Sequence, residues 1–137
     1  MSARKKSVIS KVSPHTIKKF ELIEEYIKSW AQKLMLNDSC NGLIFIDCMC
    51  NSGIYTNDAG EIVKGTAVRV SEALLEIART YMDKTVYVYL NDNDTQCVDE
   101  LEKHLPQDER NFKIITSRND AHELLRIIGP QLYETGH

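Results

Sequence analysis

The stretch FIDCMCNSGIY, Phe45 to Tyr55, decides the fold. It begins within an apolar run, reaches an acid at Asp47, and then closes a turn of small residues on Ser52 and Gly53. A continuous apolar run of this length is typical of a strand that is covered on both faces of a parallel sheet. An acid and a small-residue turn directly after such a strand are the layout of the first strand in nucleotide-binding folds.

The rest of the chain alternates predicted helices and strands. Apolar residues at helical spacing predict helices that begin after the N-terminal caps Ser13, Gly65, Asp94 and Asp120. Runs of β-branched and aromatic residues predict strands at residues 43–46, 86–90 and 112–116. Residues 57–60, with the sequence NDAG, are expected to turn a small hairpin between the first strand and the second helix.

This alternation predicts an α/β fold with a parallel sheet and right-handed crossovers. Three strands in the order 3-2-1, with helices on both faces, would form a three-layer Rossmann-like half, preceded by an amphipathic helix. Ligands are expected beyond the carboxyl ends of the strands in such a sheet. We expect a flexible basic arm over residues 1–12 and a single domain over residues 13–137.

Composition excludes several classes of function. The net charge of −3 argues against a general electrostatic hold on nucleic acid, although the basic N-terminal arm leaves a local contact open. The apolar runs are far shorter than the roughly 20 residues that span a bilayer, so we expect no membrane association. The N-terminus lacks the apolar region of a secretory signal, and a cytoplasmic location is therefore expected.

The four cysteines show no metal-binding spacing. They form no Cys-x-x-Cys pair and have no histidine at zinc spacing, so no metal site is predicted. Cys48 and Cys50 lie two residues apart on an extended segment and would point to the same side. A metal or redox pair is one interpretation of that spacing. Small buried thiols in a reducing cytosol are the interpretation that we favour.

Acids follow each of the three predicted strands. Asp47 ends the first strand, Asp92 the second, and Asp120 follows the third. Asp92 is the best candidate for a binding residue, because one carboxylate can accept both hydroxyls of a ribose. A structural role is the alternative for each acid, since aspartate often bonds the local backbone in turns. Asp94 and Asp120 are also expected to cap helices.

The first turn differs from a dinucleotide-binding loop. In a G-x-G-x-x-G loop the helix starts at once, so that its N-terminus meets a pyrophosphate. Here about a dozen residues separate Gly53 from the predicted helix that opens at Gly65. The sequence therefore favours a ligand that carries adenosine and an amino acid but no phosphate. A nicotinamide-binding oxidoreductase is disfavoured on the same ground.

Residues 15–125 resemble the N-terminal part of the three-Cys-motif partner (TcmP) family, which has a class I S-adenosylmethionine-dependent methyltransferase-like fold. The resemblance rests on the opening helix, the first-strand motif, the approach to the next helix and the acids after the second and third strands. The matching segments here are HTIKKFELIEEYIKSW, FIDCMCNSG, GEIVKGTA, Asp92-Asn93-Asp94 and Asn119-Asp120. Cys48 and Asn51 depart from the family pattern by replacing glycines of its turn.

The resemblance implies S-adenosylmethionine as cofactor. By that resemblance Asp47 and Gly53 would lie near the methionine moiety, Asp92 at the ribose hydroxyls and Asp120 near the adenine. Ser52 and Asn51 belong to the same turn, and the Asn51 side chain would reach cofactor space. The complete form of such a protein is expected to act on nucleic acid.

Length sets a limit on activity. Class I methyltransferases resemble one another in having about seven strands, with a catalytic acid-proline motif after the fourth, and this sequence shows no such motif. We therefore expect a truncated or naturally shortened form that is inactive alone, and no catalytic residue is assigned. The alternative is a non-catalytic scaffold or protein-interaction module. The apolar first strand, LIFID, would have a bare edge that pairs in a homodimer, meets a protein partner or is covered by Gln131 to His137.

Overall fold

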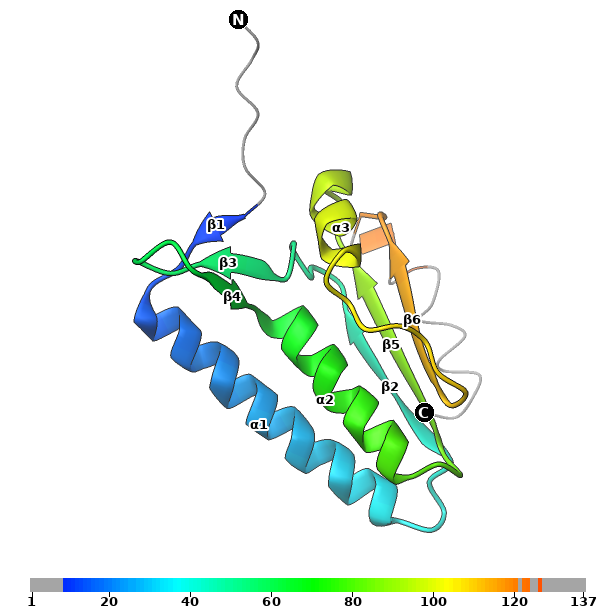
Figure 1. Cartoon of the computed structure of the whole chain (residues 1–137). Helices are drawn as coiled ribbons and strands as arrows, with labels where there is room; N and C mark the ends of the chain where they lie inside the picture. Colours follow the sequence, from blue (N-terminus) through cyan, green and yellow to red (C-terminus); the bar gives the residue numbers. More distant parts are fainter. Residues whose placement is uncertain (1–8, 121, 124–125, 127–137) are drawn as a thin grey trace, which may run out of the picture.

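The computed structural model describes residues 9–120, 122–123 and 126. Its elements are, in order, β1 (Ser10–Lys11), α1 (Pro14–Leu36), β2 (Gly42–Asp47), β3 (Ile54–Thr56), β4 (Ile62–Lys64), α2 (Thr66–Thr80), β5 (Thr85–Asn91), α3 (Thr95–Glu102) and β6 (Phe112–Ser117). They form an α/β arrangement with two small sheets (Figure 1). The three expected strands, the hairpin and the first three expected helices are all present. The helix expected after Asp120 falls largely outside the described residues.

The main sheet is parallel throughout. Its strand order is β2-β5-β6, so strands consecutive in this sheet are neighbours in space. In one row of the register, Leu43, Val86 and Phe112 lie side by side, and all three are buried. In the next row, Ile44 and Tyr87 lie side by side with large parts of their side chains exposed. Alternate residues therefore face a packed side and an open side, as the period of a strand requires.

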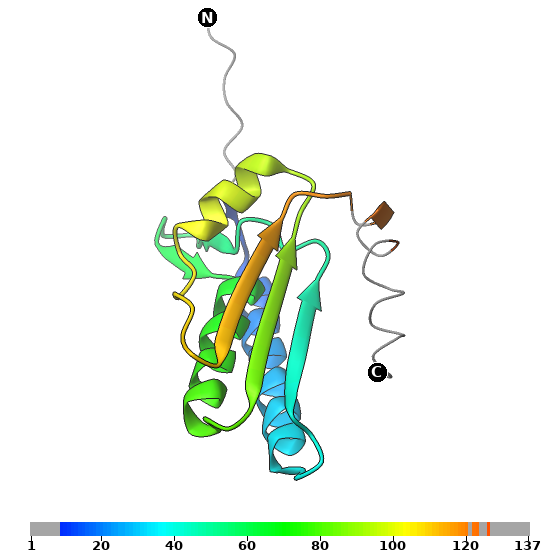
Figure 2. The same cartoon turned by 90° about the vertical axis from the view of Figure 1, so that its right-hand side faces the viewer.

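Helices α1 and α2 cover the packed face of the main sheet (Figures 1 and 2). Helix α2 supplies the centre of the core with Val68, Val70, Leu74 and Ala78, all buried against β5 residues. Helix α1 packs on α2 and buries Phe20, Ala31 and Met35, and the Phe20 ring lies 5.1 Å from that of Tyr55 in β3. Among residues 9–120, 122–123 and 126, no helix covers the opposite face, so the third layer that we expected is not described.

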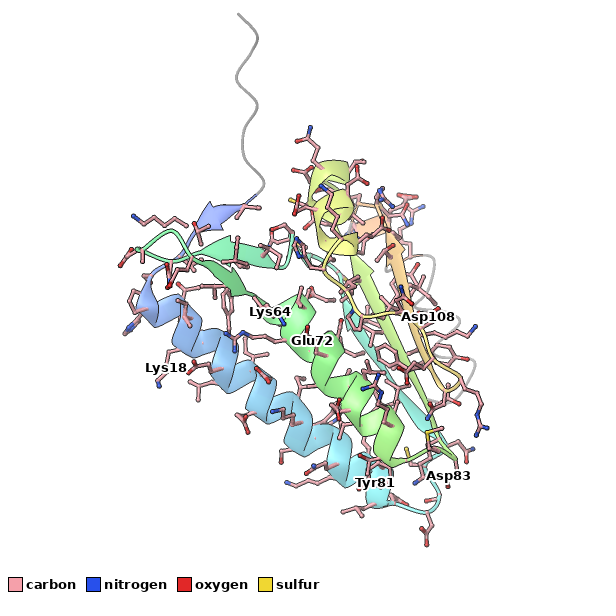
Figure 3. The ribbon with its side chains drawn as sticks, viewed as in Figure 1. Lys18, Lys64, Glu72, Tyr81, Asp83 and Asp108 are labelled. Atoms are coloured by element: carbon pink, nitrogen blue, oxygen red, sulfur yellow. The ribbon has the colours of Figure 1, made fainter. Side chains whose placement is uncertain are left out.

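A second small sheet corrects the boundary of the expected basic arm. Strands β3 and β4 form the predicted antiparallel hairpin, whose turn is held by Asn57 Oδ1 accepting from the N–H groups of Ala59 and Glu61, both at 2.9 Å. Ser10 and Lys11, which we placed in the flexible arm, instead pair in parallel with β3 as β1. The signal was missed because this pairing is made with residues about 45 positions away in the chain. Figure 3 shows Lys64 of β4 beside Glu72 of α2, to which it forms an ion pair of 2.9 Å.

Local signals set the helix starts as expected. Ser13 Oγ accepts from Thr16 N–H at 3.3 Å, and Pro14 takes the first helical position of α1. Asp94 Oδ1 accepts from the N–H groups of Gln96 and Cys97 and so caps α3. These side chains satisfy N–H groups that have no partner within their own helix.

Two buried polar side chains close the amino end of the main sheet. The Lys84 ammonium donates to the carbonyl oxygens of Met35 and Asn37, the latter at 2.9 Å, and thereby caps the C-terminus of α1. Asn111 Nδ2 donates to the carbonyls of Ala78 and Lys84, both at 2.8 Å, at the end of α2. Both groups join segments that lie far apart in the sequence.

The two edges of the main sheet differ. On β6, two outward N–H groups are already bonded: Phe112 N–H donates to the Glu109 carbonyl at 3.1 Å and Ile114 N–H to Asp108 Oδ1 at 2.9 Å. On β2, the backbone groups of Ile44 and Ile46 point away from β5, and within the described ranges no strand lies beside them. Among the described residues the β2 edge is therefore unpaired, whereas the β6 edge is partly bonded by the chain that precedes it. Gln131 to His137, one of the segments that we expected could cover the β2 edge, lie outside the described residues.

Candidate functional site

The loops after β2, β5 and β6 meet at the carboxyl ends of the main sheet (Figure 2). These loops carry the six residues that we predicted for a site: Asp47, Asn51, Ser52, Gly53, Asp92 and Asp120. The structure brings Asp92 directly against the first turn, where its Oδ2 accepts from Asn51 N–H at 2.8 Å. The acid of the second strand and the turn of the first strand therefore form one unit.

The first turn is built without its usual glycines. Asn51 has a φ of 57°, which is the left-handed region that asparagine tolerates better than most residues. Asp47 Oδ1 accepts from Met49 N–H at 3.1 Å, and Cys50 N–H donates to the Asn91 carbonyl at 2.8 Å. The N–H groups of three consecutive residues, Met49, Cys50 and Asn51, are thus all hydrogen-bonded. The Asn51 side chain is exposed at the rim.

The Asp92 carboxylate is 7% exposed and already has two backbone donors. Oδ1 accepts from Asp94 N–H at 3.0 Å, while Oδ2 accepts from Asn51 N–H. A carboxylate offers about four acceptor positions, so two remain for a ligand. Asp92 can therefore fix the two loops and still accept hydrogen bonds from hydroxyl groups at the rim.

Ser52 and Gly53 serve the packing of the turn. Ser52 Oγ is buried and donates to the Ile54 carbonyl at 2.9 Å. Gly53 has a φ of 71°, and a Cβ at this position would come within 2.6 Å of Leu101 and 3.0 Å of Val68. Glycine is therefore required here by the closeness of α3 and α2, independently of any ligand.

Asp120 acts as a helix cap, as the sequence indicated. Its Oδ1 accepts from His122 N–H at 2.9 Å and Glu123 N–H at 3.3 Å. The carboxylate is exposed, and it belongs to the same rim as Asp92 because β5 and β6 are neighbours. The apolar positions expected on this helix, Leu124, Leu125, Ile127 and Ile128, lie outside the described residues.

Burial and nearby negative charge raise the pKa values of several side chains at this turn. Burial raises the pKa of Asp47, and the nearby Asp92 charge raises it further, while the Met49 N–H lowers it. Burial, followed by the Asp47 and Asp92 charges, raises the pKa of Cys50 to about 12. Burial also raises the pKa of Cys97 to about 11. These thiols are protonated at neutral pH, which argues against a nucleophilic or redox role.

The described residues hold no group of three or more His, Cys, Asp or Glu side chains arranged to bind a metal ion. Cys48 and Cys50 are free thiols, Cys50 buried and Cys48 half-buried.

Asn91 is the residue that sequence reasoning missed. It is the last residue of β5 and is fully buried. Its amide makes four hydrogen bonds, which reach the chain after β2 and the chain at the end of β6. The only sequence signal is a polar residue immediately before Asp92, in a segment that we had assigned to a loop.

A groove of about 810 Å³ lies away from this rim. It runs along the open edge of β2 between Trp30 and Leu34 of α1 and the exposed face with Ile44, Ile46 and Tyr87. None of the six predicted site residues lines it. The polar rim and the apolar groove are therefore separate features, and only the rim offers hydrogen-bonding groups in the arrangement that the sequence indicated.

The geometry defines a parallel α/β domain with polar loops gathered at the carboxyl ends of its strands. Comparison with protein-family models, curated proteins and solved structures gave no match to this chain. In the part of the chain that the structure describes, no helix is both long enough and apolar enough to cross a membrane.

Proposed function

We propose that the rim binds the nucleoside part of S-adenosylmethionine, and that the chain is the cofactor-binding portion of a class I methyltransferase-like protein. The proposed plan is a Rossmann-like half with strand order 3-2-1. The resemblance to the TcmP family, carried by the motifs around Asp47, Asp92 and Asp120, supports the same assignment. The methyl acceptor of such a protein would be nucleic acid.

One observation carries the proposal. The Asp92 carboxylate lies 2.8 Å from the N–H of Asn51, so an acid at the end of the second strand reaches across to the first turn. In sheets of this type the crevice beyond these strand ends is where a nucleoside binds, with the acid accepting from the ribose hydroxyls. The remaining acceptor positions of Asp92 suit that role.

A second candidate function has its own support. Ser52, Gly53 and Asp120 each have a structural role, and among the described residues no strand pairs with the apolar edge of β2. A non-catalytic interaction module would need the fold and that edge but no ligand at the rim. The two functions differ in whether the purified chain binds S-adenosylhomocysteine.

Calorimetric titration with S-adenosylhomocysteine tests the proposal. Saturable binding is expected, and Asp92→Ala should weaken it by about 1.5–3 kcal/mol, the range for hydrogen bonds to a charged acceptor. Asp92→Asn, which keeps the shape of the side chain, should weaken it in the same direction. Asp58→Asn, which removes an exposed acid of the hairpin turn, is the matched control and should leave the affinity unchanged. No binding at millimolar ligand would favour the interaction module.

A further inference from the structure

We propose that Asn91 is the positioning residue of this rim, the side chain that sets the distance between the two ends of the nucleoside site. The inference rests on the proposed function for its ligand and on the hydrogen bonds of Asn91 for its mechanism. Asn91 is not one of the proposed binding residues. It acts through hydrogen bonds to residues that are adjacent to them in the chain.

The Asn91 amide joins the loops of all three parallel strands. Its Nδ2 donates to the Cys48 carbonyl at 3.0 Å and to the Asn119 carbonyl at 2.8 Å. Its Oδ1 accepts from Ser117 Oγ at 2.6 Å and Asn119 N–H at 2.9 Å. Two donors and two acceptors are all used, and their partners fix which atom of the amide is the nitrogen.

These bonds extend the sheet beyond its last regular pair. The β5–β6 ladder ends at Asn91 and Ser117. Beyond it, the Asn91 side chain bonds both the N–H and the carbonyl of Asn119, much as a neighbouring peptide would. The loop after β6 is thereby held in line with the strand, up to the residue before Asp120.

The atoms that Asn91 holds are adjacent to the proposed binding residues. Cys48 follows Asp47, Cys50 precedes Asn51, and Asn119 precedes Asp120. Asn91 itself precedes Asp92, and its carbonyl accepts from Cys50 N–H. A buried amide with every hydrogen-bonding group satisfied is rigid and costly to disturb. Asn91 therefore fixes the ribose-binding acid relative to the turn on one side and to the adenine end on the other.

Asn91→Asp tests this role, with Asn111→Asp as the matched control. Asn111 is also a buried asparagine that donates to backbone carbonyls, but it lies at the amino end of the sheet. Both variants exchange an amide for a carboxylate that cannot donate these bonds when ionised. Under conditions where circular dichroism shows both folded, Asn91→Asp should weaken S-adenosylhomocysteine binding at least tenfold, and Asn111→Asp less than twofold. Equal losses in the two variants would overturn the inference.

Amide exchange separates this inference from the proposed function. The N–H groups of Cys50 and Asn119 should exchange faster in Asn91→Asp than in Asn111→Asp. If the unaltered chain binds no S-adenosylhomocysteine, the proposed function fails, and the exchange rates alone then judge whether Asn91 holds the loops. Unchanged exchange at both amides would overturn that role.

A milder substitution covers the case in which Asn91→Asp does not fold. Ser117→Ala removes one bond to Asn91 Oδ1, whereas Ser117→Thr keeps the hydroxyl. The alanine variant should bind S-adenosylhomocysteine two- to fivefold more weakly, and its Asn119 N–H should exchange faster. The threonine variant should show neither change. Identical behaviour of the two variants would count against Asn91.

Discussion

Asn51 occupies a backbone conformation that glycine usually takes. Its φ of 57° is held by the hydrogen bond from its N–H to Asp92, and its side chain is exposed and hydrogen-bonds Tyr55. A left-handed conformation costs a residue with a Cβ about 1–2 kcal/mol, and less for asparagine. The turn therefore keeps its shape with a small residual strain.

Substitution of Asn51 measures that strain. Asn51→Gly should raise the free energy of unfolding by up to about 1 kcal/mol, because glycine adopts positive φ without a steric cost. Asn51→Ala should lower it by about 1 kcal/mol, since alanine lacks the tolerance of asparagine. Urea denaturation gives both values. S-adenosylhomocysteine should bind the glycine variant equally or more tightly, and weaker binding would show that the Asn51 side chain makes a ligand contact of its own.

Asp47 predicts a specific pH dependence. Its pKa is raised in the folded chain, so between the unfolded pKa of about 3.8 and the folded value the folded state binds more protons. Stability from this group is therefore greatest below the unfolded pKa and is lost as pH rises through the folded pKa. Asp47→Asn should match the unaltered chain at low pH and become the more stable of the two toward neutral pH. Denaturation at several pH values tests this, and a constant difference would contradict it.

Some site residues could be predicted from the sequence and others could not. Asp47, Asp92 and Asp120 could be predicted because an acid directly after a strand is a local pattern. Asn91, Asn111 and Lys84 were not, because their partners lie in segments distant along the chain. Local patterns identify which end of the sheet carries polar groups, but the bonds between loops depend on which strands become neighbours.

At the scale of elements, helix starts and strands followed from local chemistry. Proline at the first helical position, aspartate caps and β-branched runs are each decided within a few residues. Strand β1 was missed because its two residues have no strand signal and depend on β3. On the amphipathic helix α1, Ile23 is 41% exposed, whereas Phe20, Ala31 and Met35 are buried.

Helix α2 contains a buried hydroxyl group, that of Ser71, whose removal is expected to stabilise the fold. Ser71 is fully buried, and its Oγ has no hydrogen-bond partner among the described residues. Ser71→Ala should raise the free energy of unfolding by about 1–2 kcal/mol, because it removes an unsatisfied hydroxyl and improves helix propensity. Ser29→Ala at an exposed position of α1 is the control and should gain only the propensity, about 0.5 kcal/mol. Equal gains in the two variants would mean that Ser71 has a partner, such as a buried water.

At the scale of the whole molecule, the open edge of β2 is the feature with a consequence for assembly. Within the described residues this edge is unpaired, and its strand is apolar from Leu43 to Ile46, without proline. An apolar edge strand of this kind pairs readily with another strand. Strand β6 provides a comparison, because the outward N–H groups of Phe112 and Ile114 are bonded to Glu109 and Asp108. A contact between copies is therefore expected at β2, in line with the sequence-based expectation of a homodimer.

Two matched lysine substitutions test this contact. Ile44 on β2 and Ile115 on β6 lie on the same open face and are 43% and 42% exposed. Ile44→Lys should abolish concentration-dependent dimerisation in sedimentation experiments, because charge on an edge strand opposes pairing. Ile115→Lys should leave it intact. A chain that is monomeric at all concentrations, or two variants that behave alike, would exclude the β2 edge as the contact.

Because Cys50 is buried, the rate at which its thiol reacts can report how often the first turn opens. Because burial raises its pKa to about 12, this thiol is protonated at pH 7 while the turn stays packed. An alkylating reagent therefore modifies Cys50 at an appreciable rate only when the turn leaves its packed position and the thiol regains an ordinary acidity. The rate of labelling at this one sulfur, followed by mass spectrometry, would report how often the loop rim comes apart while the rest of the sheet stays folded.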